Sequence, residues 1–243
     1  MSKETKPVEN EEGLGKHLQL PMQRRTFFRY ASASAAAATI LLTTACDDDD
    51  DDDMTPPPVG AVNLGSGDVG VLNYAYALEQ LEAAFYTMVV AEAGNALTSD
   101  EMNVMMDLKA HEVAHRELFK AALGSNAIPA LEVDFSSVNF NDKSSILQTA
   151  KTFENLGVAA YNGAGKLLTD TGVGLDYLLL AGKIVSVEAR HAAAIDDLIA
   201  GNGRFGEEFI DEDGLDRAMM PSAVLAAAAP FITTEIDFSN LPQ

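Results

Sequence analysis

Cysteine and basic residues are scarce in this sequence, and each shortage excludes a class of protein. The 243 residues include one cysteine, so the chain has no internal disulfide framework and no Cys-x-x-Cys zinc site. Lys and Arg number 16 against 37 Asp and Glu, which gives a formal net charge of −21. This balance argues against binding to nucleic acid or to anionic lipid, because both need clustered basic side chains. Beyond the N-terminal segment, no apolar run is long enough to span a bilayer.

Residues 1–45 are typical of an export signal rather than of a folded domain. A polar start is followed by Arg24-Arg25, two phenylalanines and a weakly apolar run rich in alanine, the pattern of a twin-arginine signal. Cys46 ends a Leu-Thr-Thr-Ala-Cys stretch that resembles a bacterial lipobox. We therefore expect an exported protein of the cell envelope (periplasm, outer membrane or surface), anchored by lipid at Cys46. Cleavage after Ala45, which would leave Cys46 as a free thiol, is the alternative.

Residues 46–66 are expected to form a tether. Seven consecutive aspartates at 47–53 repel one another, and three prolines at 56–58 stiffen the chain that follows. A segment of this composition cannot bury itself, so we expect the folded domain to begin after it.

Residues 67–201 predict a bundle of four long helices, because apolar side chains recur at helical spacing. Thr98 and Glu101 form a capping box before the second helix. The expected helices span residues 68–93, 99–123, from 141–144 to 168, and 173–200. Their connections are short, long and short, so we expect an all-α four-helix bundle with one long crossover. Residues 202–243 predict a loop and an extra helix near 222–229, packed on the bundle.

Two Glu-x-x-His motifs lie on the expected helices. Glu112 and His115 belong to the second helix, and Glu188 and His191 belong to the fourth. A spacing of three residues places both side chains of a motif on one helix face. One such motif alone is usually surface charge, so the pair matters only with the residues that accompany it.

The first and third helices each carry a glutamate two turns before a tyrosine: Glu79 with Tyr86, and Glu154 with Tyr161. The separation between this glutamate and the glutamate of the next Glu-x-x-His motif is 33 residues in the first half of the chain and 34 residues in the second. The chain therefore consists of two similar helix pairs. One glutamate from each of two helices and Glu-x-x-His from the other two is the ligand set of dinuclear carboxylate centres in helical bundles.

The chemistry of these residues favours metal binding. Four carboxylates facing one core would be very costly to bury unpaired. Two divalent cations would balance their charge, with both imidazoles as neutral ligands. Glutamate and histidine together suit iron or manganese, and zinc could also bind. We therefore expect two Fe or Mn ions between the four helices.

The segments 78–86 (LEQLEAAFY) and 111–115 (HEVAH) resemble the ferritin-like domain family of exported bacterial proteins, which is similar in turn to plant desiccation-related proteins. The resemblance covers about residues 68–235 and implies a ferritin-like four-helix bundle. It also implies that Glu112 and Glu188 bridge the two metals.

The same resemblance gives the remaining residues their roles. Glu79 and Glu154 would be terminal ligands, and His115 and His191 would each bind one metal. Tyr86 and Tyr161 would hydrogen-bond the carboxylate of the opposite helix.

A dinuclear site of this type is expected to react with O2 or peroxide. The leading function is oxidation or sequestration of iron, or removal of peroxide, and a manganese form would resemble a manganese catalase. A lipid anchor and a long tether suit a monomer or dimer better than a closed cage. A non-catalytic, stress-protective protein of the envelope is the alternative.

A second alternative comes from His111, because residues 111–115 also match the HExxH signature of zinc metallopeptidases. In that interpretation His111 and His115 bind zinc and Glu112 is the base. It leaves four of the six expected ligands unexplained, and the fourth helix carries Val187 where His111 would be repeated.

Glu82 also faces the interior of the expected bundle. Its counterpart on the third helix is Gly157, so the repeat gives it no matching ligand. We interpret it as a neighbour of the ligands or a solvated charge, and not as a ligand.

Overall fold

The computed structural model describes residues 60–201 and 209–242. The predicted signal with Arg24 and Arg25, the lipidation site Cys46 and residues 46–59 of the tether lie outside the described residues. The expected boundaries between signal, tether, bundle and C-terminal part stay predictions.

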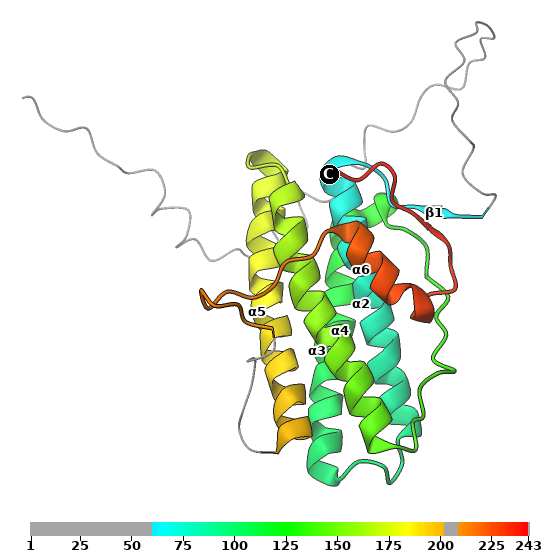
Figure 1. Ribbon diagram of the computed structural model, residues 1–243. Helices are drawn as coiled ribbons and strands as arrows, with labels where there is room; N and C mark the ends of the chain where they lie inside the picture. Colours follow the sequence, from blue (N-terminus) through cyan, green and yellow to red (C-terminus); the bar gives the residue numbers. More distant parts are fainter. Residues whose placement is uncertain (1–59, 202–208, 243) are drawn as a thin grey trace, which may run out of the picture. The chain divides into compact units, whose positions relative to one another are not determined.

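The predicted all-α four-helix bundle with one long crossover is confirmed (Figure 1). Its helices are α2 (Gly67–Glu92), α3 (Ser99–Leu123), α4 (Lys143–Ala164) and α5 (Gly172–Ala200). The connection from α3 to α4 begins with a 3-10 turn, η3 (Gly124–Asn126), and then runs along the bundle. Within the described ranges, no helix is long and apolar enough to cross a membrane.

Local sequence explains where these helices begin and end. Thr98 accepts a hydrogen bond from the Glu101 amide, and the Glu101 carboxylate accepts one from the Thr98 amide, so the predicted capping box is confirmed. Gly201 ends α5 in the left-handed conformation at φ 64°, which glycine adopts without strain. Helix α4 ends at Ala164, earlier than predicted, because a 3-10 turn, η4 (Gly165–Leu167), takes its last residues.

Aromatic side chains join the crossover and the C-terminal part to the bundle. Phe85 of α2 meets Phe153 of α4 with ring centroids 5.0 Å apart, and Phe135 of the crossover lies 5.7 Å from Phe85. The ring centroid of Phe231, in the 3-10 turn that follows the last α-helix, lies 4.8 Å from that of Phe153. These edge-on contacts bury large apolar areas. As a result α2 is buried along most of its length, which keeps water from the glutamates it carries.

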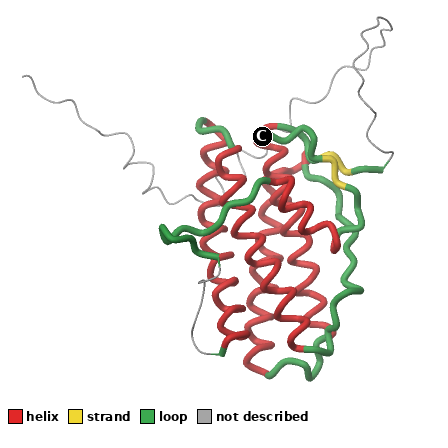
Figure 2. The backbone as a smooth tube through the Cα atoms, in the orientation of Figure 1, coloured by secondary structure: helices red, strands yellow, loops and turns green. Residues whose placement is uncertain are grey.

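The C-terminal part contains the predicted extra helix, α6 (Pro221–Ala228), which packs on α4 and is followed by η5 (Ala229–Phe231). Beyond it, β2 (Ile236–Asp237) pairs in parallel with β1 (Val62–Asn63), the short yellow segments of Figure 2. The sequence did not predict this pair, because two-residue strands carry no periodic signal.

Candidate metal centre

The six predicted ligands meet in the middle of the bundle. The four glutamates are fully buried, His191 is 4% exposed and His115 is 9% exposed. Each of the four long helices supplies one glutamate, and α3 and α5 add the two histidines. The residues are Glu79, Glu112, His115, Glu154, Glu188 and His191.

The cluster divides into two overlapping groups, each able to hold one metal ion. The first is Glu79, Glu112, His115 and Glu188, and the second is Glu112, Glu154, Glu188 and His191. Within each group one ligand atom from every residue lies within 4.8 Å of the others. Glu112 and Glu188 belong to both groups, so their carboxylates lie between the two positions, as bridging ligands must.

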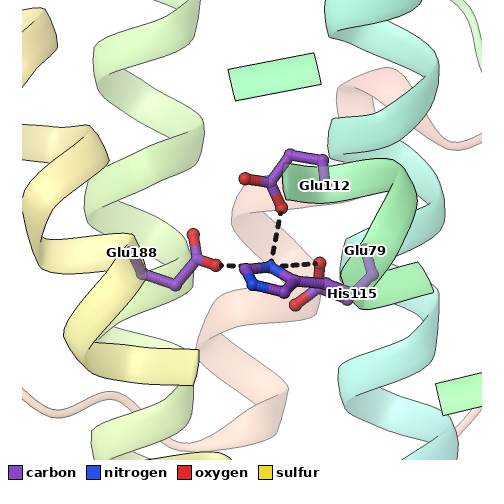
Figure 3. Close-up of side chains that lie close together, drawn as sticks. All are labelled: Glu79, Glu112, His115 and Glu188. Atoms are coloured by element: carbon purple, nitrogen blue, oxygen red, sulfur yellow. Dashed lines mark hydrogen bonds and ion pairs between the residues drawn. The ribbon is translucent and has the colours of Figure 1, made fainter. Parts of the chain in front are cut away.

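His115 faces the first group through Nδ1 (Figure 3). This nitrogen lies 3.1 Å from Glu188 Oε1, 3.3 Å from Glu112 Oε2 and 3.4 Å from Glu79 Oε2. One N–H donates fully to one acceptor, so a single imidazole cannot satisfy three carboxylates. The convergence of three oxygens on one nitrogen is the arrangement that a shared cation would stabilise.

His191 faces the second group in the same way. Its Nδ1 lies 2.8 Å from Glu112 Oε1, 3.4 Å from Glu154 Oε2 and 3.7 Å from Glu188 Oε2. Although the first of these distances is short, His191 Nδ1 makes no hydrogen bond among the described residues. The two atoms are therefore close without a hydrogen bond between them, which a shared cation would explain.

Several buried atoms of the cluster lack hydrogen-bond partners within the described part of the chain. They are Glu79 Oε2, Glu112 Oε1, Glu154 Oε2, both carboxylate oxygens of Glu188, and His191 Nδ1. An unpaired buried carboxylate oxygen costs free energy, and native proteins leave few of them. Oxygen and imidazole donors suit iron and manganese. The residues present therefore fit a pair of such ions.

The pKa values of the clustered histidines and glutamates also indicate that positive charge would stabilise the cluster. Burial alone lowers the pKa of His115 and of His191, but close contacts with the negatively charged glutamates around them outweigh it and raise both pKa values to about 12. Burial raises the pKa of Glu154 to about 8, and that of Glu79 well above its usual value. Without metal, protonated groups must supply the charge that divalent cations would supply.

The two tyrosines cross between the halves of the bundle. The Tyr86 hydroxyl of α2 donates to Glu154 Oε1 on α4, and the Tyr161 hydroxyl of α4 donates to Glu79 Oε1 on α2. Each bond occupies one oxygen of a glutamate and leaves the other, Oε2, facing the histidine. The tyrosines therefore orient the two glutamates that belong to only one group each.

Glu82 is buried, so its interpretation as a solvated charge is wrong. Its carboxyl lies over Gly157, where an added Cβ would come within 3.2 Å of Glu82 Oε1 and 3.4 Å of Glu188 Oε2. Burial and the surrounding glutamates, Glu188 foremost, raise its pKa well above the usual value. It stands outside both ligand groups. Gly157 thus provides the space for a carboxyl beside the centre.

His111 is exposed and also stands outside both ligand groups. Its Nδ1 lies 2.9 Å from Nε2 of His191, not beside the carboxylates that surround His115. The structure therefore lends no support to a zinc site built from His111 and His115. The contact between His111 and His191 was not predicted, because nothing in a single sequence says which residues of α3 face α5.

A comparison with protein families matches residues 67–201 to the ferritin-like domain. The match covers more than half of the chain, contains all four long helices and includes each of the six clustered glutamates and histidines. Among curated proteins, no relative matches this sequence.

Proposed function

The chain belongs to the ferritin-like domain family, and from this we propose that it is an exported metalloprotein with a dinuclear iron or manganese centre. The centre would serve to oxidise or sequester iron, or to remove peroxide. The observation that carries the proposal is the pair of overlapping four-residue groups, which share Glu112 and Glu188.

The chain's own residues would hold the ions and keep water away. Glu79 and His115 serve one position only, Glu154 and His191 serve the other, and the shared carboxylates join them. Two iron or manganese ions bound there would supply the two-electron chemistry that reaction with O2 or peroxide needs. Because the four glutamates are fully buried, the site would be dry, which strengthens each electrostatic contact in it.

The first experiment is the metal content of the purified chain by elemental analysis, with optical spectra before and after peroxide. Two iron or manganese ions per chain and a spectrum that responds to peroxide would support the proposal. Bound metal without any response to O2 or peroxide would favour a metal kept for stability in a stress-protective protein. Failure to bind metal under loading conditions would refute the dinuclear assignment.

We also propose that the protein is anchored in the cell envelope by lipid at Cys46. The support is sequence alone: Arg24-Arg25 before an apolar run, and the chain's single cysteine at the end of it. Mass spectrometry of the N-terminus tests lipidation directly. Cys46→Ser should move the protein from the membrane fraction to the soluble one, whereas unchanged fractionation would contradict an anchor there.

A further proposal concerns assembly. A tethered domain suits a monomer or dimer, with metal ions and O2 or peroxide as its partners, rather than a closed cage. Light scattering of the purified protein decides this, since a cage would have a mass many times that of the 25.8 kDa chain.

A further inference from the structure

The two halves of the metal centre differ one helical turn before each motif histidine. In α3 this position is His111, and in α5 it is Val187. The ring of His111 stacks on that of His191, with centroids 5.1 Å apart and planes 7° apart. His111 Nδ1 lies 2.9 Å from His191 Nε2, within hydrogen-bond distance. Valine offers no such group to the other half.

The contact offers an acceptor to the Nε2 proton of His191 when a metal occupies Nδ1. His191 turns Nδ1 toward Glu112 and Glu154, so Nδ1 is the nitrogen available to an ion. The proton then resides on Nε2, which donates to Nδ1 of His111. A ligand histidine whose other nitrogen donates to an acceptor is held in one tautomer and one orientation. Because His111 is exposed, its own N–H can face water.

His115 lacks this support. It also turns Nδ1 toward the carboxylates, but its Nε2 has no hydrogen-bond partner among residues 60–201 and 209–242. No histidine of the described chain therefore supports the His115 ring from behind, as His111 supports that of His191. The two metal positions offer equivalent carboxylate and imidazole ligands. They differ in whether another side chain contacts Nε2 of the histidine.

We propose that His111 is a positioning residue that makes the two metal positions unequal. The metal position that contains His191 binds its ion more tightly and fills first; its residues are Glu112, Glu154, Glu188 and His191. The metal position that contains His115 binds a divalent ion that exchanges with free ions more readily; its residues are Glu79, Glu112, His115 and Glu188. This inference rests on the proposed dinuclear function. Loss of a partner behind a metal-binding histidine typically lowers metal affinity by about 10- to 100-fold, which sets the expected difference.

The test measures each position by itself in the full chain, with Mn²⁺ under anaerobic conditions. Glu79→Gln removes a ligand that only the His115 position uses, and Glu154→Gln removes one that only the His191 position uses. Electron paramagnetic resonance of free Mn²⁺ gives the dissociation constant of the remaining position. We expect His111→Val to weaken Mn²⁺ binding roughly 10-fold or more in the Glu79→Gln chain, and to leave it unchanged in the Glu154→Gln chain.

Two matched variants separate positioning from a general effect on structure. His111→Asn keeps an acceptor oxygen near the place of Nδ1 and should restore most of the affinity. Val187→His places an imidazole behind His115 and should tighten Mn²⁺ binding in the Glu154→Gln chain. If either Gln variant fails to fold, titration of the two-site chain with and without His111→Val gives the same comparison, because only the tighter step should weaken.

Equal weakening of both positions by His111→Val, or no weakening of either, would overturn the inference while leaving the dinuclear function intact. An unsubstituted chain that binds no Mn²⁺ and no iron would overturn the function and the inference together.

Discussion

The pair α2–α3 and the pair α4–α5 carry the same ligands and differ in most of what surrounds them. Residues 75 apart in α2 and α4, and 76 apart in α3 and α5, correspond at every ligand and at both tyrosines. Around those positions the halves diverge: His111 corresponds to Val187, Glu82 to Gly157, and Met88 to Gly163. The repeat therefore holds at every clustered carboxylate and imidazole and at both tyrosines, while some of their neighbours differ.

The divergence follows from what covers each half. Gly163 of α4 lies under the C-terminal segment, where the Met219 amide donates to the Ala159 carbonyl at 2.9 Å. The corresponding Met88 of α2 is 38% exposed, and no segment among the described residues crosses the helix there. A helix crossed by another backbone needs small residues at the crossing, and an uncovered one does not. Similar ligands thus coexist with different packing.

The largest expected effect separates shared from unshared ligands. Glu112→Ala, or the milder Glu188→Gln, should abolish binding of both ions, because each carboxylate belongs to both groups. Glu79→Gln and Glu154→Gln should each abolish binding of one ion. His191→Ala should likewise abolish binding of one ion, the one in the tighter position. Elemental analysis of the purified variants checks this, and retention of both ions by Glu112→Ala would disprove the assignment.

The next effect concerns Gly163 and Met88. A Cβ at Gly163 would overlap the carbonyl oxygen of Met219, so Gly163→Ala should destabilise the fold by about 3 kcal/mol through overpacking. In a helix that no other segment crosses, a glycine-to-alanine change would stabilise the fold by up to about 1 kcal/mol. The sign of the change in the free energy of unfolding therefore shows whether Gly163 is crowded. Met88→Ala should change stability by less than about 0.5 kcal/mol. Urea unfolding of both variants measures the difference.

The tyrosines should behave alike in spite of the unequal halves. Tyr86→Phe leaves Glu154 Oε1 without its donor, and Tyr161→Phe does the same to Glu79 Oε1. Each change should cost about 1–3 kcal/mol, the usual range for a buried acceptor that loses its partner. Thermal unfolding of the metal-free proteins provides the measurement. A cost confined to one tyrosine would show that the crossed contacts are not equivalent.

The smallest effects lie at the helix starts. Thr98→Ala breaks the capping box of α3 and should cost about 1 kcal/mol. Thr171, before α5, makes no capping hydrogen bond with its side chain within the described structure, so Thr171→Ala should cost almost nothing. Denaturant unfolding of both variants tests the contrast, and equal costs would contradict the capping geometry.

The pH dependence of this cap follows from Glu101. A hydrogen bond from the Lys143 ammonium, followed by one from the Thr98 amide, lowers the pKa of the Glu101 carboxyl in the folded state. Its contribution to stability is therefore present above the unfolded-state pKa of about 4.3 and lost as the pH falls through the lowered folded-state pKa. Glu101→Gln should destabilise at neutral pH, and the difference should vanish in strong acid. Salt should weaken it, because Lys143 is half exposed.

Most of the buried cluster was predictable because the candidate ligands follow helical spacing. Glu112 with His115, and Glu188 with His191, lie three residues apart, so one helix face must present both side chains. Other contacts had no local signal. The hydrogen bond between His111 and His191 joins residues 80 apart, and the strand pair joins Val62 with Ile236. Burial of Glu82 depended on the space above Gly157, which belongs to another helix.

The sequence by itself determined an all-α bundle of two similar helix pairs and the six residues that face its core, because spacing along one helix fixes which side chains share a face. Only the tertiary structure decided that the six form two groups with shared carboxylates, that His111 supports one histidine and not the other, and that Glu82 is buried beside the centre. Those outcomes depend on how one helix is rotated and shifted against another, and that geometry is set by packing across the whole bundle.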